Sequence, residues 1–434
     1  MAWGKRAGVD DLIQKLATPR TGTSLCVMRS RSLCDADMAQ LAHAISHNTT
    51  LRELYLSGHE LGPLALQAFA ACLATNSTLE HLSLGSDKLG DEGVTLLCAG
   101  LARNPHSGLQ RWDLESKSLG LAGASAIGHV LQTNKTLTSL TLSRNRIGDE
   151  GIDQLVKGVR ANAHVPLAEL HVTDVAISGA GLAHLTPWLA SRECSLTTLQ
   201  LSFNQLEDTP AAFWNAIASN ASVTTLLLKA CKLMDHHVAH LAAALRDNRT
   251  LIELDLSDNQ LTHVACASLA NGLRHNKTLR TLRLSTNTCH DQGAQLLAQT
   301  LETHNATLTY LDLGNNQLTS TSMTLLLKAQ ALKHLHLFHN NLAHGVVHLV
   351  PVLRTNSVIE TLGVGANQLH ERLSAILFDA LHSHPSLKTL EMGGNTLGKE
   401  GHAALDKLKR VNHMLDVAVD KNAQNVDGSF DWQT

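Results

Sequence analysis

A repeated pattern of leucines constrains the fold of this chain more than any other feature. The string L-x-x-L-x-L-x-x-N-x-L occurs at residues 137–147 and returns in the same frame from residues 196, 251 and 308. Full or partial frames begin at 51, 79, 109, 137, 167, 196, 223, 251, 279, 308, 332, 359 and 387. From 51 to 387 there are 336 residues over 12 steps, a mean of 28 per step. Such a fixed period indicates stacked structural repeats rather than separate globular domains.

Each repeat combines a short strand with a helix. The L-x-x-L-x-L part has the period-two alternation of a strand, and the rest has apolar residues at helical spacing. Stacked repeats bury what one strand and one helix cannot, as a parallel sheet backed by helices. Helices are roughly 10 Å wide and strands lie about 4.8 Å apart, so the stack bends with the sheet inside. We therefore expect an α/β solenoid, a right-handed horseshoe with the sheet on its concave face and helices on its convex face.

The ends of the chain differ from the array. We expect residues 1–22 to form a capping helix and lead-in, 23–410 the array of about 13 full repeats plus a weaker first one, and 411–434 a cap strand and polar tail. The interval from 308 to 332 is only 24 residues, which predicts a shorter helix there. The residues behind these assignments are Val9, Leu12, Ile13 and Leu16 for the helix, Thr18 and Pro19 for its end, Thr23, Cys26, Met28 and Leu33 for the first repeat, and Met414, Val417, Val419, Asn422 and Trp432 for the C-terminal segment.

These repeats resemble the ribonuclease-inhibitor-like class of leucine-rich repeats, which have 27–30 residues and an L-x-x-L-x-L-x-x-N/C-x-L core. Similar arrays occur in NOD-like receptors, in Ran GTPase-activating proteins and in effectors of plant-pathogenic bacteria. The resemblance covers roughly residues 23–410 and is specific for the fold, whereas it says little about function. Cys231 is the class's alternative to Asn. Four other repeats depart from the Asn position, which predicts an interrupted Asn ladder in the N-terminal half: His59, Asp87, Lys117 and Val175.

Charge and cysteine usage narrow the functional classes. The formal charge is −3 and charged residues make up 17% of the chain, which excludes a strongly basic nucleic-acid binder. No apolar run approaches the roughly 18 residues of a membrane span, and the N-terminus lacks the apolar stretch of a secretory signal. The eight cysteines form no C-x-x-C pair. This pattern favours reduced, buried thiols and a cytoplasmic protein, the alternative being a bacterial protein exported into a host cell.

No motif with a catalytic mechanism is present, so we expect no enzymatic activity and no cofactor. His236 with His240, and His334 with His336 and His339, raise the possibility of a metal site. Neither group supplies the three or four converging ligands that zinc needs, so we expect no bound metal. The N-x-[S/T] sequons at Asn48, Asn76, Asn134, Asn220, Asn248 and Asn276 share one phase of the repeat, which indicates a structural role rather than glycosylation.

The strand face is the surface predicted to carry function. Positions 2, 3, 5, 7 and 8 of each frame point to it, and equivalent positions of adjacent repeats lie one strand apart. By contrast, Phe69, Trp112, Phe213 and Trp214 are predicted to be core. We expect an exposed ion-pair ladder of Asp255, Arg283 and Asp312, with Glu253 nearby. The predicted partner-binding patch comprises Asp255, Arg283, Tyr310, Asp312, His334, His336, Phe338 and His339, and a secondary patch comprises Gln200, Phe203 and Leu227.

We predict that the chain is a non-enzymatic protein-interaction scaffold that binds a protein partner on its concave face and is monomeric. Action as a bacterial effector in a host cell is one role that such a scaffold could have. We expect no nucleic acid, membrane or small-molecule substrate as partner. Two alternatives stay open. One is a GTPase-activating protein resembling the Ran type, for which Arg144 or Arg146 is the candidate residue. The other is the substrate-recognition subunit of a ubiquitin ligase assembly.

Overall fold

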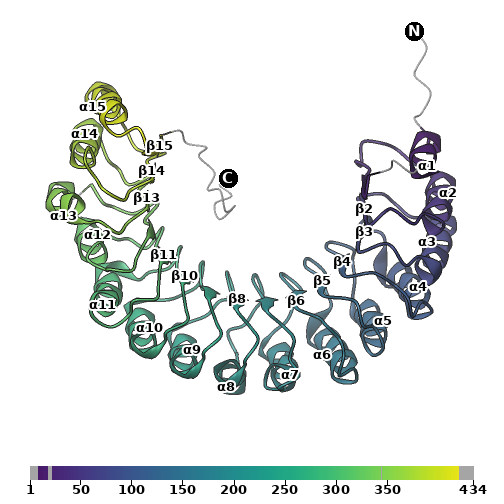
Figure 1. Ribbon diagram of the computed structural model, residues 1–434. Helices are drawn as coiled ribbons and strands as arrows, with labels where there is room; N and C mark the ends of the chain where they lie inside the picture. The colour runs from purple at the N-terminus through teal and green to yellow at the C-terminus, as the bar shows by residue number, and fades with distance from the viewer. Residues whose placement is uncertain (1–7, 18–21, 344, 420–434) are drawn as a thin grey trace, which may run out of the picture. The chain divides into compact units, whose positions relative to one another are not determined.

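The computed structural model describes residues 8–17, 22–343 and 345–419. The chain divides into two compact units, residues 1–225 and 226–434. Each unit is an α/β solenoid in which short parallel strands alternate with helices, and within a unit the helices lie on the outer side of the sheet (Figure 1). The predicted fold class is therefore confirmed for each unit.

In the first unit, neighbours in sequence are neighbours in the sheet from β1 to β7, as Leu54↔Leu82 and Leu140↔Leu170 illustrate. Its strands are β1 (Ser24–Cys26), β2 (Glu53–Ser57), β3 (His81–Gly85), β4 (Arg111–Asp113), β5 (Ser139–Thr141), β6 (Glu169–His171) and β7 (Thr198–Gln200). Its helices are α1 (Asp10–Ala17), α2 (Asp35–Ser46), α3 (Pro63–Thr75), α4 (Gly90–Ala102), α5 (Leu121–Leu131), α6 (Gly148–Arg160), α7 (Gly179–Leu189) and α8 (Ala211–Ser219).

The second unit repeats this arrangement from β9 to β15, with Leu282↔Leu311 and Leu362↔Leu390 in register. The strands are β8 (Thr225–Leu227), β9 (Glu253–Asp255), β10 (Thr281–Arg283), β11 (Tyr310–Asp312), β12 (His334–His336), β13 (Thr361–Gly363), β14 (Thr389–Glu391) and β15 (Asp416–Ala418). The helices are α9 (Asp235–Asp247), α10 (His263–His275), α11 (His290–Thr303), α12 (Ser320–Leu326), the 3-10 helix η1 (Val346–His348), α13 (Leu349–Thr355), α14 (Glu371–Ala380) and α15 (Gly398–Val411).

Leucines at the inward strand positions form the core. Leu140, Leu254 and Leu311 are fully buried, as the period-two pattern predicts. The four aromatic residues assigned to the core, Phe69, Trp112, Phe213 and Trp214, are buried as well. The predicted short helix is α12, which has seven residues where α10 has 13.

The predicted register of the first repeat is wrong by one residue. Leu25, rather than Cys26, pairs with the inward Leu54, while Cys26 pairs with Tyr55 on the strand face. Val27 is buried and Met28 is 69% exposed, the reverse of the prediction. A slip of one residue moves every side chain of a strand to the opposite face. It also explains why Cys26 is exposed and contradicts the expectation of uniformly buried thiols, to which Cys34 is a second exception.

The asparagines that follow the helices are structural, because their side chains join adjacent repeats. Asn276 is fully buried, and its Nδ2 donates to Leu245 O at 2.8 Å while its Oδ1 accepts from Leu279 N at 2.8 Å. Asn76 and Asn220 make the same two kinds of bond. The side-chain amide of Asn276 is therefore engaged in the core, which agrees with a structural role for the sequons.

A second row of asparagines, at the consensus position after each strand, joins backbone groups of neighbouring repeats. In the second unit the row is continuous from Asn259 onward, and Asn316 is typical: its Oδ1 accepts from Cys289 N at 3.1 Å and its Nδ2 donates to Leu284 O at 2.8 Å. In the first unit only Asn145 and Asn204 hold the equivalent position with this bonding pattern. The predicted interruption of the ladder is thus confirmed. The members in the second unit are Asn259, Asn287, Asn316, Asn340, Asn367 and Asn395.

At the ends of the chain, α1 buries Leu12 and Leu16 where a helix is predicted, and β15 forms with Val417 buried. The predicted helix stop at Thr18 and Pro19 lies outside the described residues. So do Asn422, Trp432 and the polar tail.

Candidate functional site

Four side chains of the predicted patch form one stacked row across β10, β11 and β12, which we call the aromatic column. The Arg283 guanidinium carbon lies 5.1 Å from the centroid of the Tyr310 ring. The Tyr310 ring stacks on His336 with centroids 5.0 Å apart, and His336 stacks on Phe338 at 5.6 Å. The planes of these ring pairs are tilted by only 29° and 28°. The structure thus brings together the arginine and the aromatic members of the patch.

Gly363, which ends β13, and Gly365, just after that strand, support the end of the column. A Cβ atom at Gly363 would lie 2.7 Å from the Phe338 ring and 2.9 Å from His336 Nδ1, and one at Gly365 would lie 2.8 Å from the ring. These three distances are far below a normal contact, so the ring lies directly on the backbone of this segment. Phe338 is half-buried as a result. Gly363 and Gly365 therefore fix the position of Phe338, although neither belongs to the predicted patch.

Asp312, the last member of the predicted ladder, does not lie on the surface, and neither does its neighbour His336. Asp312 is 1% exposed and His336 4%. The Asp312 carboxylate accepts from Gly314 N at 2.8 Å, and burial raises the pKa of this group. Its row is crowded, since Arg283 and His336 are its register neighbours on either side. Asp312 is thus a buried acid beneath the column, and the prediction of an exposed ion-pair ladder that includes it is wrong.

Arg283 is the cation of this region. Burial opposes its charge, but the Glu253 carboxylate, to which it is hydrogen-bonded, and the nearby Asp255 outweigh that effect and raise the pKa of the guanidinium. Asp255 is half-buried and its Oδ1 accepts from Ser257 N at 2.8 Å. The arginine is therefore held both by an acid and by the face of Tyr310.

The far end of the column also carries an acid. Glu391 on β14 is the register neighbour of Gly363, and its Oε2 lies 3.5 Å from His336 Nδ1. The Glu391 side chain is 14% exposed. Because position 363 has no side chain, the carboxylate reaches across that strand toward His336. Glu391 is a site residue that the sequence-based patch missed.

The remaining predicted residues form the rim of the patch. His334 is half-buried, its Nδ1 is 3.0 Å from Thr361 Oγ1, and burial lowers its pKa. His339 is exposed and has a left-handed backbone with φ of 54°. Beside them, Glu360 bonds Lys333 at 2.7 Å and also Lys388, and these hydrogen bonds lower the pKa of Glu360 to about 2. The rim is thus charged and largely self-neutralised, whereas the column is aromatic.

Comparison with known proteins identifies the repeats. The family described as "Leucine Rich repeat" matches residues 47–70, 75–98, 133–156, 193–209, 247–270, 275–298, 304–327 and 383–405. The chain is a leucine-rich-repeat protein.

Its relatives are repeat proteins of the predicted class. The ribonuclease inhibitor of Mus musculus is 27% identical over 402 residues, which cover 91% of this chain and 75% of that protein. NACHT, LRR and PYD domains-containing protein 12 of Homo sapiens is 30% identical over 403 residues, 89% of this chain and 36% of that protein. Among solved structures, an internalin from Listeria monocytogenes aligns with 95% of the chain at 18% identity and a TM-score of 0.44. The chain spans only 28% of the length of NACHT, LRR and PYD domains-containing protein 14 of Mus musculus.

The secondary patch of this leucine-rich-repeat protein is split between the two units. In the first unit, Phe203 is 50% exposed and has a φ of 60°, and Gln200 at the end of β7 is half-buried. Leu227 belongs to the second unit and is half-buried. Each is accessible in part within its own unit.

The strand face of the first unit holds an aromatic pair that the sequence analysis did not single out. The Tyr55 and His81 rings lie 4.7 Å apart, and Tyr55 Oη is 3.2 Å from His81 Nδ1. Burial raises the pKa of Tyr55 and lowers that of His81. Register could have found this pair, because residues 53 and 81 are in register and Tyr55 is two residues away on the same face.

Lys117 replaces the ladder asparagine in the first unit and is 2% exposed. Its Nζ donates to Ser57 Oγ at 2.8 Å, and burial lowers its pKa. Arg144 and Arg146, the residues of the GTPase-activating hypothesis, are exposed on the loop after β5, and Arg144 lies 3.4 Å from Glu115. The loops that follow β4 and β5 in the first unit thus carry polar and charged side chains.

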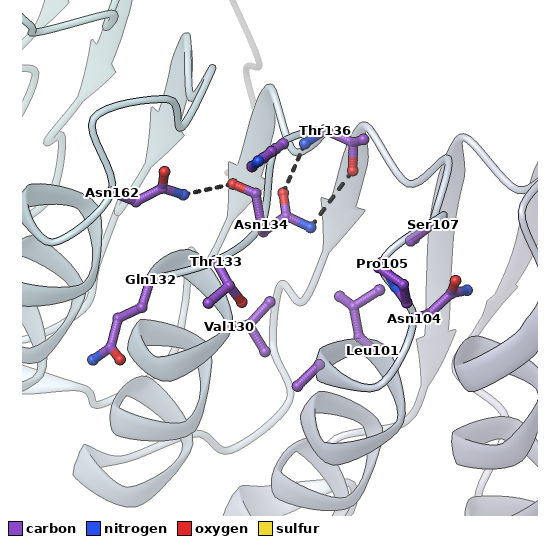
Figure 2. Close-up of a pocket in the computed structure, with 12 residues that line it drawn as sticks. Leu101, Asn104, Pro105, Ser107, Val130, Gln132, Thr133, Asn134, Thr136 and Asn162 are labelled. Atoms are coloured by element: carbon purple, nitrogen blue, oxygen red, sulfur yellow. Dashed lines mark hydrogen bonds between the residues drawn. The ribbon is translucent and has the colours of Figure 1, made fainter.

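A cavity of 530 Å³ lies in the first unit between the loops that follow the helices (Figure 2). The loop from Asn104 to Leu109 has two more residues than that from Asn76 to Leu79, which separates adjacent loops. Two of the asparagines that line it are already bonded: Asn162 Nδ2 donates to Asn134 O at 2.7 Å, and Asn134 Oδ1 accepts from Thr136 N at 3.0 Å (Figure 2). The cavity is therefore part of the inter-repeat network rather than a set of converging functional groups.

Within residues 8–17, 22–343 and 345–419, no group of three His, Cys, Asp or Glu side chains is placed to hold a metal ion. In the part of the chain that the structure describes, no helix is long and apolar enough to cross a membrane.

Proposed function

We propose that this leucine-rich-repeat protein is a non-enzymatic interaction module that binds a protein partner through the strand face of its second unit. The observation that carries the proposal is the aromatic column. Its Tyr310 and Phe338 are half-buried side chains held in one arrangement by stacking and by Gly363 and Gly365. Aromatic and arginine side chains that are fixed before binding are enriched among the residues that dominate binding energy.

Preorganisation gives the column an energetic advantage. A side chain immobilised on binding costs about 0.5–1.5 kcal/mol in lost rotamer freedom, and a side chain already held in place avoids much of that cost. The stack restrains Tyr310 and Phe338 before a partner arrives. A long exposed side chain that makes no such contacts would have to be ordered on binding.

Relatives support the same reading. The name of the mouse ribonuclease inhibitor states that it acts on another protein, and this chain aligns with 75% of it. Since the chain shares its repeat type, a protein partner is the occupant we propose for the strand face. The aligned regions of the NACHT-containing relatives are small parts of larger proteins, so their activities are not transferred.

The test is capture of a partner by the immobilised chain from native lysate, followed by measurement of its affinity for variants. The double variant Tyr310→Ala/Phe338→Ala should weaken binding at least a hundredfold, because truncation of a hot-spot side chain costs about 2 kcal/mol or more. Leu96→Ala is the control, since Leu96 is an exposed leucine on α4.

The control should bind within twofold of wild type. A captured protein that binds the double variant as tightly as wild type would contradict the proposed site, and reproducible absence of any captured protein would count against the module itself.

A further inference from the structure

One repeat of the second unit has a histidine where its neighbours have the asparagine that follows the helix. His384 lies in the turn that joins α14 to β14 (Figure 1). The same position holds Asn356 in the preceding repeat and Asn412 in the following one. His384 is 6% exposed and Asn356 is 9% exposed, so both side chains belong to the interior. A structural position is thus occupied by a side chain that can change its charge near neutral pH.

The Nδ1 atom of His384 replaces the side-chain oxygen of asparagine. It accepts hydrogen bonds from Leu387 N at 3.1 Å and from Ser386 N at 3.4 Å. Asn356 Oδ1 accepts the equivalent bond from Ile359 N at 2.9 Å. A backbone N–H can only donate, so Nδ1 of His384 carries no proton and the neutral ring has its hydrogen on Nε2.

The other ring nitrogen does not make the contact between repeats that an asparagine makes. Asn356 Nδ2 donates to Leu327 O of the preceding repeat at 2.7 Å. His384 Nε2, by contrast, is buried without a hydrogen-bond partner among the residues that the structure describes. The two bonds at Nδ1 are therefore the whole contribution of this side chain to the polar network of the turn.

We infer that His384 is a pH-sensitive link in the second unit, whose neutral ring holds the turn before β14 closed and whose protonation releases that turn. An imidazolium ring has two N–H donors and no acceptor. A proton on Nδ1 therefore removes the acceptor of Ser386 N and Leu387 N, and Leu387 is buried. Asparagine gains no proton, so the turns held by Asn276 and Asn356 lack this response.

The charged and titratable groups on the elements around this turn are exposed or paired with one another. Asp379, in the last turn of α14, lies 3.4 Å from Lys407 of α15 and 3.5 Å from His382. Burial is the cause that lowers the pKa of His384 from its ordinary value of 6.5. The whole set comprises Arg354, Glu360, Asp379, His382, Lys388, Lys407 and His413.

The direction of the pH effect follows from this lowered pKa. The open turn, in which the ring is solvated, takes up a proton as pH falls through 6.5, whereas the closed turn does so only at lower pH. The stability of the closed turn is therefore greatest above 6.5 and falls as pH falls through that value. The loss ends below the pKa of the folded ring, where both states bind the proton.

Hydrogen exchange of the full chain, followed by mass spectrometry at about pH 7.5 and about pH 5, tests the link across the range in which histidine changes charge. Protection is corrected for the intrinsic pH dependence of amide exchange. In the peptide that holds Ser386 and Leu387 it should fall at least about fivefold at the lower pH, because one unit of pKa difference corresponds to about tenfold in the opening equilibrium. The reference peptide holds Leu279, whose N–H donates to Asn276 Oδ1 at 2.8 Å, and its protection should stay constant.

The chain has 26 histidines, so variants must separate His384 from the others. His384→Asn restores the residue of the neighbouring repeats and should remove the pH dependence while it keeps the protection seen at neutral pH. His382→Gln removes the adjacent histidine and should leave the pH dependence unchanged. Asn356→His should introduce the same pH dependence in the peptide that holds Ile359. Far-UV circular dichroism at neutral pH verifies that each variant is folded.

Four results would overturn the inference. The first is equal protection of Ser386 and Leu387 at both pH values in the wild-type chain. The second is a fall in protection that persists in His384→Asn, and the third is a fall that disappears in His382→Gln. The fourth is a folded Asn356→His protein whose Ile359 peptide shows no pH dependence.

Discussion

The two units of this protein share one repeat but use it differently. In the second unit every repeat from Asn259 to Asn395 keeps the asparagine that bonds backbone groups of its neighbours. In the first unit the equivalent positions include Asp87, which is exposed, and Lys117, which is buried and bonded to Ser57. The regular unit also carries the aromatic column. In the second unit the ladder asparagines bond the backbone groups after each strand, so the strand-face side chains can form a stacked surface. In the first unit other side chains, such as those of Lys117 and Ser57, bond each other at the equivalent positions.

The comparison predicts its largest stability effect at the asparagine ladder. Asn316→Ala should lower the free energy of unfolding by about 3 kcal/mol, because it leaves the buried N–H of Cys289 without its side-chain acceptor and removes one hydrogen bond each from Leu284 O and Gly314 O. Asp87→Ala, at the same repeat position in the first unit, should change it by at most about 0.5 kcal/mol. Urea unfolding followed by circular dichroism measures both. Equal losses would show that the two ladders do not differ.

Gly363→Ala should have the next largest effect on the free energy of unfolding. The added methyl group must displace Phe338 and His336, and such overpacking costs about 1–3 kcal/mol. Gly22→Ala is the matched control, because nothing lies within 4 Å of a Cβ atom placed there. Thermal unfolding of both variants measures the difference. A stable Gly363→Ala variant with an unchanged Phe338 NMR signal would contradict the close contact.

Lys117 should give the first unit a dependence on pH that the ladder asparagines cannot give the second. Burial lowers its pKa from the ordinary value of 10.5, so as pH rises toward that value the folded state releases its proton before the unfolded state does. The unfolded state then binds more protons, and stability rises with pH. Wild type should therefore gain stability relative to Lys117→Met as pH rises toward 10.5. Urea midpoints of the two proteins at a series of pH values test this. A stability of wild type relative to Lys117→Met that stays constant or falls as pH rises would contradict it.

The smallest effect should come from the rim of the column. Glu360→Gln removes the charge that pairs with Lys333 and Lys388, but exposed ion pairs contribute only about 0–1 kcal/mol. Hydrogen bonds from these lysines lower the pKa of Glu360 to about 2, so the contribution is present above its ordinary value of 4.5 and is lost as pH falls toward about 2. Urea midpoints of the two proteins should differ slightly at pH 7 and coincide near pH 2. A difference that persists there would indicate a role for Glu360 other than its charge.

The sequence predicts the fold well and the site only in part. The strands and the buried leucines follow from the strict alternation of apolar residues. The first repeat shows where prediction from alternation fails. There Leu25 and Val27 alternate as convincingly as Cys26 and Met28, and only pairing with Leu54 decides between them.

The helix-end asparagines show a second limit. Asparagine at a helix end is typical of a left-handed cap, yet Asn276 has φ of −71° and ψ of 134°. Its side chain bonds the preceding repeat, and the extended backbone aims it there. A contact between repeats thus overrides the local preference of the residue.

The strand-face positions of the repeat predict that Tyr310, His336 and Phe338 lie together. They do not predict how deeply each of these side chains is buried. Exposure of each side chain depends on the size of its neighbours on adjacent strands. The absence of a side chain at Gly363 lets Phe338 and Glu391 lie over β13, while Asp312 is covered in a crowded row. Reading register neighbours along with phase would have added Glu391 and Gly363 to the predicted site.

Site-specific photo-crosslinking tests the central claim most directly. A photoreactive phenylalanine analogue is placed at Phe338 in one sample and at Tyr55, on the strand face of the first unit, in another, and each is irradiated with the captured partner. The account predicts a crosslink to the partner from position 338 and at least tenfold less from position 55. Crosslinking from position 55 with none from position 338 would contradict it.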